Sequence, residues 1–217
     1  MPTLSITSLS KSFRAGAAGC TARVSVLRSL DLALWPGEIV ALSGACASGR
    51  STLLQCAAGL LTPDAGSIYW LGARAVPRDL VVYASERAHH RSCESSSRGE
   101  GALYAALHAR LCAGQLATPS REPKLLIVDD LERVTAIERR LVLSLFARDA
   151  LAGASVLFAA DAELAAAPCV TRVVTLANGA LLQRRKRSAA RIAASSRDSR
   201  ARASARSTYG RSLRSPQ

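Results

Sequence analysis

The chain has 217 residues, of which 49% are hydrophobic and 4% aromatic, so a single domain can bury a full core filled mainly by alanine and leucine. Its formal net charge of +13 is concentrated in residues 184–217, which carry ten arginines and one lysine against one aspartate. The six cysteines lack zinc-ligand spacing, and acidic residues interrupt the longest apolar stretch at 151–170, which argues against a zinc site and a membrane-spanning helix.

The N-terminal half is predicted to begin with strands. Period-two alternation predicts strands at 3–9 and 24–34, with a glycine- and alanine-rich loop at 15–22 between them. The apolar run at 38–42 predicts a buried strand, and a helix is expected over 52–58. A strand, a glycine-containing loop and a helix in this order point backbone N–H groups and a helix N-terminus at a phosphate.

The remaining elements complete an alternating α/β pattern followed by a basic tail. A bare apolar run at 125–128 is typical of a buried parallel strand. The other predictions are a strand at 67–71, a loop at 87–101, helices at 102–113 and 136–150, and strands at 154–159 and 172–177. We therefore expect a domain over 1–183 and a disordered Arg/Ser/Ala-rich tail over 184–217.

The loop that follows the third predicted strand has the spacing of a phosphate-binding loop, G-x-x-x-x-G-K-[ST], with arginine in place of lysine. The candidate ligand-binding residues are Gly44, Ala45, Cys46, Ala47, Ser48, Gly49, Arg50, Ser51 and Thr52. Arg50 keeps the positive charge, but its planar fork is wider than an ammonium group. A displacement of about 1 Å costs on the order of 100-fold in rate, so we expect binding with weak or absent hydrolysis. Because the chain has only three lysines, compositional drift is an alternative cause of the substitution.

Several segments around this loop share one resemblance. They are the turn Trp35-Pro36-Gly37-Glu38, the run Ala58-Gly59-Leu60-Leu61-Thr62-Pro63-Asp64-Ala65-Gly66, the strand Leu125-Leu126-Ile127-Val128-Asp129-Asp130 and the segment 173–181. Together they resemble the ATP-binding subunit of ABC transporters over about residues 3–183. The resemblance implies a P-loop α/β fold of ABC type: a mainly parallel sheet flanked by helices, an antiparallel N-terminal β portion and a truncated helical subdomain.

The resemblance also assigns roles to individual residues. Phe13 would stack on adenine, with a surface or core aromatic as the structural alternative. Magnesium would be held by Ser51, Asp129 and Glu86, the last in place of the glutamine of the family. Asp130 takes the position of the general base, although helix capping or a solvated carboxylate is equally compatible with the sequence.

Departures from the family pattern indicate eroded catalysis. Ala47 replaces a glycine of the loop, and Ala160 stands where the family has a switch histidine. Only 79 residues separate Arg50 from Asp129, too few for the full helical subdomain, and the nearest remnant of the signature motif is the segment 97–101.

The expected function is an ATP-binding subunit of a membrane transporter. It would bind ATP and Mg²⁺, pair with a permease subunit and a second ATP-binding subunit, and lie in the cytoplasm at the inner face of the membrane through that partner. One alternative is a non-catalytic regulatory or scaffold protein with Arg50 turned into the empty loop and paired with Asp129 or Asp130. Another is a nucleic-acid-associated P-loop protein acting through the basic tail, which could also contact anionic lipid.

Overall fold

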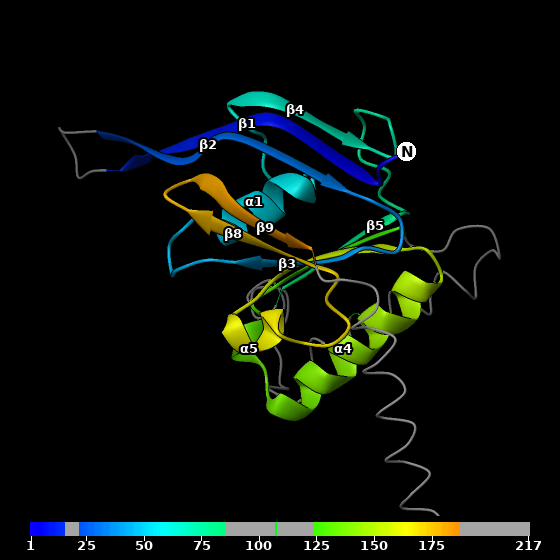
Figure 1. Cartoon of the computed structure of the whole chain (residues 1–217). Helices are drawn as coiled ribbons and strands as arrows, with labels where there is room; N and C mark the ends of the chain where they lie inside the picture. Colours follow the sequence, from blue (N-terminus) through cyan, green and yellow to red (C-terminus); the bar gives the residue numbers. More distant parts are fainter. Residues whose placement is uncertain (16–21, 86–106, 108–123, 187–217) are drawn as a thin grey trace, which may run out of the picture.

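The computed structural model describes residues 1–15, 22–85, 107 and 124–186, and these form two sheets. The smaller sheet is antiparallel in the order β2-β1-β4. Its strands are β1 (Leu4–Ala15), β2 (Ala22–Leu34) and β4 (Ala65–Trp70). Figure 1 shows this sheet as a separate layer at the top of the molecule.

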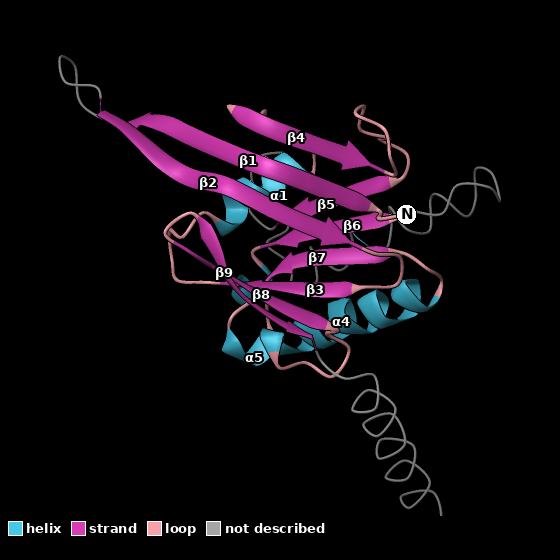
Figure 2. Cartoon of the chain, turned by 45° about the horizontal axis from the view of Figure 1, so that its top comes forward, coloured by secondary structure: helices cyan, strands magenta, loops and turns pink. Residues whose placement is uncertain are grey.

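The larger sheet has six strands in the order β5-β6-β7-β3-β8-β9. Its strands are β3 (Ile39–Ser43), β5 (Val81–Ser85), β6 (Leu125–Asp129), β7 (Ser155–Ala159), β8 (Arg172–Ala177) and β9 (Ala180–Lys186). The first five strands in this order are parallel, and β9 pairs antiparallel with β8 at the edge. The carboxyl ends of five strands therefore meet along one edge, with β3 between β7 and β8 (Figure 2).

The described helices lie on both faces of the parallel sheet. α1 (Arg50–Ala57) lies between the two sheets, whereas α4 (Ala136–Leu151) and α5 (Ala162–Ala165) lie on the opposite face (Figure 1). A short 3₁₀ turn, η1 (Leu131–Arg133), leads from β6 toward α4. None of the helices in the described part of the chain has the length and apolarity that crossing a membrane requires.

Alternation along β3 explains why the core has two halves. Val40 and Leu42 belong to the apolar cluster shared with α1 and the antiparallel sheet, whereas Ile39 and Ala41 belong to the cluster beneath α4. Successive strand residues point to opposite faces, so a central strand covered on both sides must be apolar throughout. All four side chains are accordingly buried.

The predicted α/β fold is confirmed, with differences at element boundaries. Helix α1 starts at Arg50 rather than at 52, and β5 was not predicted. Strand β9 continues to Lys186, past the expected boundary at 183, because its last residues pair with the start of β8. The predicted loop at 87–101 lies outside the described residues, as does the helix at 102–113 apart from Leu107, which is helical and buried.

Candidate functional site

The candidate site begins at the loop between β3 and α1, at the carboxyl edge of the parallel sheet. In open α/β sheets ligands bind outside this edge. Gly44 is required by close packing, because a Cβ at this position would lie 2.4 Å from the carbonyl oxygen of Leu176 and 2.7 Å from Oγ of Ser48. The start of the loop is therefore pressed against the end of β8, which fixes its path.

The backbone of the loop turns through two left-handed residues. Gly49 has φ +101°, a value that favours glycine, and it precedes the first residue of α1. Ala47 has φ +61°, a left-handed conformation that favours glycine, at a cost of about 1–2 kcal/mol for an alanine. Between them, Oγ of Ser48 is buried and has no hydrogen-bond partner among the described residues.

Arg50 lies at the start of α1 and points toward the ends of β6 and β7. Its Nη1 donates to Oε2 of Glu132 and to the carbonyl oxygen of Ala160, both at 3.0 Å. Its Nη2 donates to Oε1 of Glu132 at 3.0 Å. The two Nη atoms thus hold the carboxylate as a fork, the geometry in which arginine pairs most strongly with anions. The alternative in which Arg50 pairs with Asp129 or Asp130 is wrong, because its carboxylate partner is Glu132.

Asp129 ends β6 at the carboxyl edge and is almost fully buried. Its Oδ1 accepts from the backbone N–H of Asp130 at 2.9 Å. Burial raises the pKa of Asp129, while a hydrogen bond with Ser51 and the charge of Arg50 act in the opposite direction. The Ser51 hydroxyl, predicted with the Asp129 carboxylate as a magnesium ligand, is thus one of the groups that lower the pKa of Asp129, and magnesium binding stays a prediction.

Asp130 has a left-handed backbone, φ +59°, and its side chain is buried. Its Oδ2 accepts from Oγ of Ser85 at 2.8 Å, and it makes no capping hydrogen bond to η1. Both structural alternatives for Asp130 are therefore wrong: the carboxylate neither caps a helix nor faces solvent. The role of general base stays a prediction.

A tyrosine that the sequence did not single out lies beside these carboxylates. Tyr83 is in β5, and burial together with the nearby Asp129 raises the pKa of its phenol, against hydrogen bonds from Ser85 and Gln55. Ser85 thus connects Tyr83 and Asp130. The sequence carried no signal for this arrangement, because it depends on the parallel pairing of β5 with β6, which brings Ser85 opposite Asp129.

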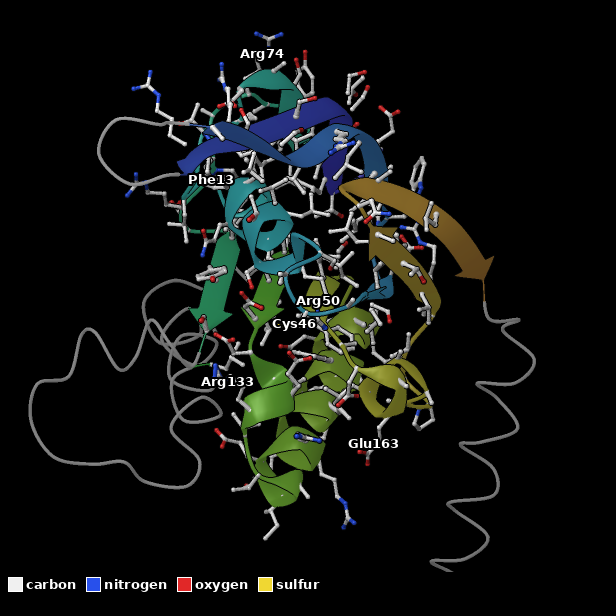
Figure 3. All side chains as sticks on the ribbon, turned by 90° about the vertical axis from the view of Figure 1, so that its left-hand side faces the viewer. Phe13, Cys46, Arg50, Arg74, Arg133 and Glu163 are labelled. Carbon is white, nitrogen blue, oxygen red and sulfur yellow. The ribbon has the colours of Figure 1, made fainter. Side chains whose placement is uncertain are left out.

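Phe13 lies on the antiparallel sheet rather than in the loop. Its ring is exposed, and Nζ of Lys11 lies 5.6 Å from the ring centroid. Phe13 lies on strand β1, whereas Figure 3 shows Arg50 and Cys46 at or just before the start of α1. The ring of Phe13 is thus accessible, and adenine stacking stays a prediction.

The other predicted residues divide into three groups. Ala45 and Cys46 are exposed at the tip of the loop, and Thr52 lies in the first turn of α1. Glu86 lies outside the described residues. Within the described ranges, no group of three or more His, Cys, Asp or Glu side chains could hold a metal ion on its own. A magnesium ion would therefore need additional oxygen ligands, as Mg²⁺ obtains from nucleotide phosphates and water.

Sequence comparisons agree with this geometry. The family model "ABC transporter" matches residues 27–98. A putative ABC transporter ATP-binding protein of Streptomyces avermitilis is 50% identical over 62 residues, which are 27% of this chain and 11% of that protein. The cytochrome c biogenesis ATP-binding export protein CcmA of Cupriavidus necator is 37% identical over 131 residues, which are 58% of this chain and 56% of that protein. The aligned part of the chain thus spans little more than half of the second relative and a small part of the first.

Solved structures extend the similarity to most of the fold. A dimeric ATP-binding cassette bound to ADP and phosphate in a post-hydrolysis state has a TM-score of 0.62 at 14% identity, covering 84% of this chain and 98% of that one. An ATP-binding subunit of an ABC transporter has a TM-score of 0.57 at 20% identity, covering 85% and 90%. At these identities the likeness establishes the fold: mixed α/β, with a parallel sheet and an antiparallel portion.

Proposed function

Because the chain has the fold of ABC cassettes and resembles the ATP-binding subunits of ABC transporters in sequence, we propose that it binds Mg-ATP as such a subunit and hydrolyses it weakly or not at all. The single observation that carries the proposal is the phosphate-binding loop at residues 44–52, which keeps its place between β3 and α1.

Nucleotide binding is supported by the polar groups that the loop leaves without partners. The first N–H groups of α1 have no acceptor within the helix, and the dipole of the helix favours an anion at that end. The unpartnered Oγ of Ser48 adds a buried donor in the same loop. A buried hydroxyl without a hydrogen bond is costly, and a phosphate oxygen would supply the missing partner.

Magnesium is supported by the pair of Ser51 and Asp129. A hydroxyl and a carboxylate are hard oxygen ligands of the kind Mg²⁺ takes, with phosphate and water completing its octahedron. Asp129 is already held by the backbone N–H of Asp130, so it would not need to reorganise. The bound ion would neutralise charge on the phosphates and would favour the ionised form of Asp129, whose pKa burial raises.

Weak hydrolysis is supported by three residues: Arg50 at the start of α1, Asp130 after β6 and Ala160 after β7. Arg50 is engaged with Glu132, so it is not poised as a free cation over the loop. Asp130 is one methylene shorter than glutamate and is bound by Ser85. Ala160 offers its carbonyl oxygen to Arg50 and has no side chain to hold a phosphate or a water. Phosphoryl transfer depends on the positioning of such groups, so each change slows the reaction.

The proposed partners follow from the resemblance. A transmembrane permease and a second ATP-binding subunit would complete the assembly, and the chain would lie at the inner face of the membrane through the permease. Adenine would stack on the exposed face of Phe13. Because the chain matches only part of its relatives, the transported substrate is left unassigned.

The experiment that tests the proposal measures Mg-ATP affinity by calorimetry and phosphate release by a coupled assay, for the natural chain and for Arg50→Lys. We expect the natural chain to bind with a dissociation constant of roughly 1 μM to 1 mM and to release phosphate close to the background rate. An Arg50→Lys variant that gains hydrolysis would show that the remaining groups are assembled. Absence of binding heat with Mg-ATP for both proteins would refute nucleotide binding.

A second candidate function is a regulatory or scaffold protein that keeps the fold without binding nucleotide. One observation favours it: the guanidinium of Arg50 is already satisfied by Glu132 and the carbonyl of Ala160 without any phosphate. This candidate predicts that melting temperature does not change when millimolar Mg-ATP is added, whereas binding would raise it by mass action.

A further inference from the structure

Three of the five N–H donors of Arg50 are used within the protein. Glu132 accepts one from each Nη atom, and the carbonyl oxygen of Ala160 accepts a second one from Nη1. An arginine side chain has five such donors, so Nε–H and one hydrogen of Nη2 remain. Among the described residues, nothing accepts from these two. A phosphate that binds Arg50 would therefore find one edge of the guanidinium already occupied by a carboxylate.

Glu132 is held in this position by its backbone. It lies in the 3₁₀ turn η1, directly after Leu131, whose side chain is fully buried. The carbonyl oxygen of Glu132 accepts a hydrogen bond from Nη2 of Arg139 on α4. These two contacts fix the backbone of the turn, and the fixed backbone keeps the carboxylate of Glu132 within reach of Arg50. The side chain itself is one third exposed, so it can rotate toward solvent when the pair is broken.

The charges around Arg50 are predominantly negative. Asp129, Asp130 and Glu132 lie at the end of β6 and in the turn that follows it, and Arg50 is bonded to the last of them. In phosphate-binding loops the basic side chain at the position of Arg50 reaches the β- and γ-phosphates. A terminal phosphate that contacts Arg50 must therefore either displace Glu132 or lie beside its carboxylate.

We propose that Glu132 is a specificity-determining residue. Its carboxylate, which pairs with Arg50, lowers the affinity of the site for nucleoside triphosphate more than for nucleoside diphosphate. This inference rests on the proposed nucleotide binding. The added γ-phosphate of a triphosphate brings further negative charge to the side of the site where Arg50 and Glu132 meet. Like charges at close range repel, and the repulsion is reduced but not abolished by solvent.

The test compares Mg-ATP and Mg-ADP affinities, measured by calorimetry on the full chain. The variant Glu132→Gln keeps the shape of the side chain and removes its charge. We expect Mg-ATP to bind on the order of tenfold more tightly to this variant, whereas Mg-ADP affinity changes by less than about threefold. The ratio of the two affinities is the decisive readout, since a loss of fold would weaken both ligands together. Glu132→Asp keeps the negative charge, so its ratio of the two affinities should lie closer to that of the natural chain than the ratio of Glu132→Gln does.

Glu163→Gln is the matched control. Glu163 is an exposed carboxylate of α5, after β7, and it pairs with Arg139 at 3.7 Å rather than with Arg50 (Figure 3). Its removal changes the net charge by the same amount and should leave the ATP-to-ADP ratio unchanged.

The outcomes separate the two proposals. Binding by the natural chain with the same ratio in Glu132→Gln overturns the inference and leaves the proposed function standing. An equal change of ratio in Glu163→Gln also overturns it, because the effect would then be one of net charge. No binding of either nucleotide to the natural chain or to Glu132→Gln overturns both proposals.

Discussion

Cys46 precedes α1, Cys56 lies near the end of this helix, and the two thiols differ in their environment. Cys46 is exposed in the loop, whereas Cys56 is buried, and its burial raises the pKa of the thiol to about 11. Because the thiolate is the reactive form, we predict that a maleimide labels Cys46 at least tenfold faster than Cys56 at pH 7.5. Peptide mass spectrometry resolves the two sites.

The same experiment reports on ligand binding. If residues 44–52 hold phosphate, saturating Mg-ATP should slow labelling of Cys46 severalfold, and the rate at Cys169, which lies outside the loop, serves as the control. Equal labelling of Cys46 with and without nucleotide would contradict occupation of the loop.

Asp129 is placed at a cost to stability. Burial raises the pKa of its carboxyl, so ionisation is less favourable in the folded than in the unfolded chain. The stability contributed by such a group is present below the unfolded pKa of about 4 and is lost as pH rises through the folded value. We predict that Asp129→Asn raises the free energy of unfolding by roughly 0.5–2 kcal/mol at pH 7 and by little near pH 4. Urea denaturation at both pH values measures this, and an equal gain at both would point to packing instead.

At the residue scale, sequence reasoning found the loop and Asp129 but missed the partner of Arg50. Motif spacing identifies a residue by its position along the chain, and it selects Ser51 and Asp129, whose interaction lowers the pKa of Asp129. The ion pair with Glu132 depends on where the turn after β6 directs its side chains. Three carboxylates lie within four consecutive residues there, and the structure shows that Glu132, in η1, is the one that pairs with Arg50.

At the scale of elements, α4 is attached to the sheet through an aromatic pair. Phe146 of α4 and Phe158 of β7 are fully buried, with ring centroids 5.2 Å apart. We predict that Phe146→Ala lowers the free energy of unfolding by about 3–5 kcal/mol, because it removes a large buried side chain and leaves a cavity. Urea denaturation followed by circular dichroism measures the loss.

Ile137→Ala on the same helix provides the comparison. Its side chain is 72% exposed, so its removal should change stability by less than about 0.5 kcal/mol. Similar losses in the two variants would mean that helix propensity, rather than packing against the sheet, determines the effect at Phe146.

The elements themselves were largely predictable, because their patterns are physical requirements of burial. The bare apolar run of β6 is typical of a strand covered on both faces, and its five residues are all buried. Strand β5 was missed because its five residues alternate too briefly to separate from the surrounding loop. It is recognisable as a strand only through its parallel pairing with β6, which sequence periodicity does not contain.

At the scale of the whole molecule, much of the positive charge lies in a part of the chain that follows the described strands and helices. Residues 187–217 hold eight of the 26 arginines and a single aspartate, and they follow the last described strand. Nucleotide affinity should therefore not depend on them, because every residue placed at the candidate site precedes β9. Binding to polyanions should depend on them, since it follows the number of cationic side chains that neutralise phosphates.

We therefore predict opposite results for a chain ending at Lys186. Its Mg-ATP affinity should lie within about twofold of that of the full chain, whereas its elution from heparin should shift to markedly lower salt. A control with the tail arginines replaced by glutamine at full length separates charge from length. If the shortened chain bound RNA as tightly as the full one and with the same salt dependence, the basic tail would not be the polyanion-binding part. The folded domain, in which carboxylates such as Asp64 and Glu132 pair with some of the described cationic side chains, would then have to supply that surface.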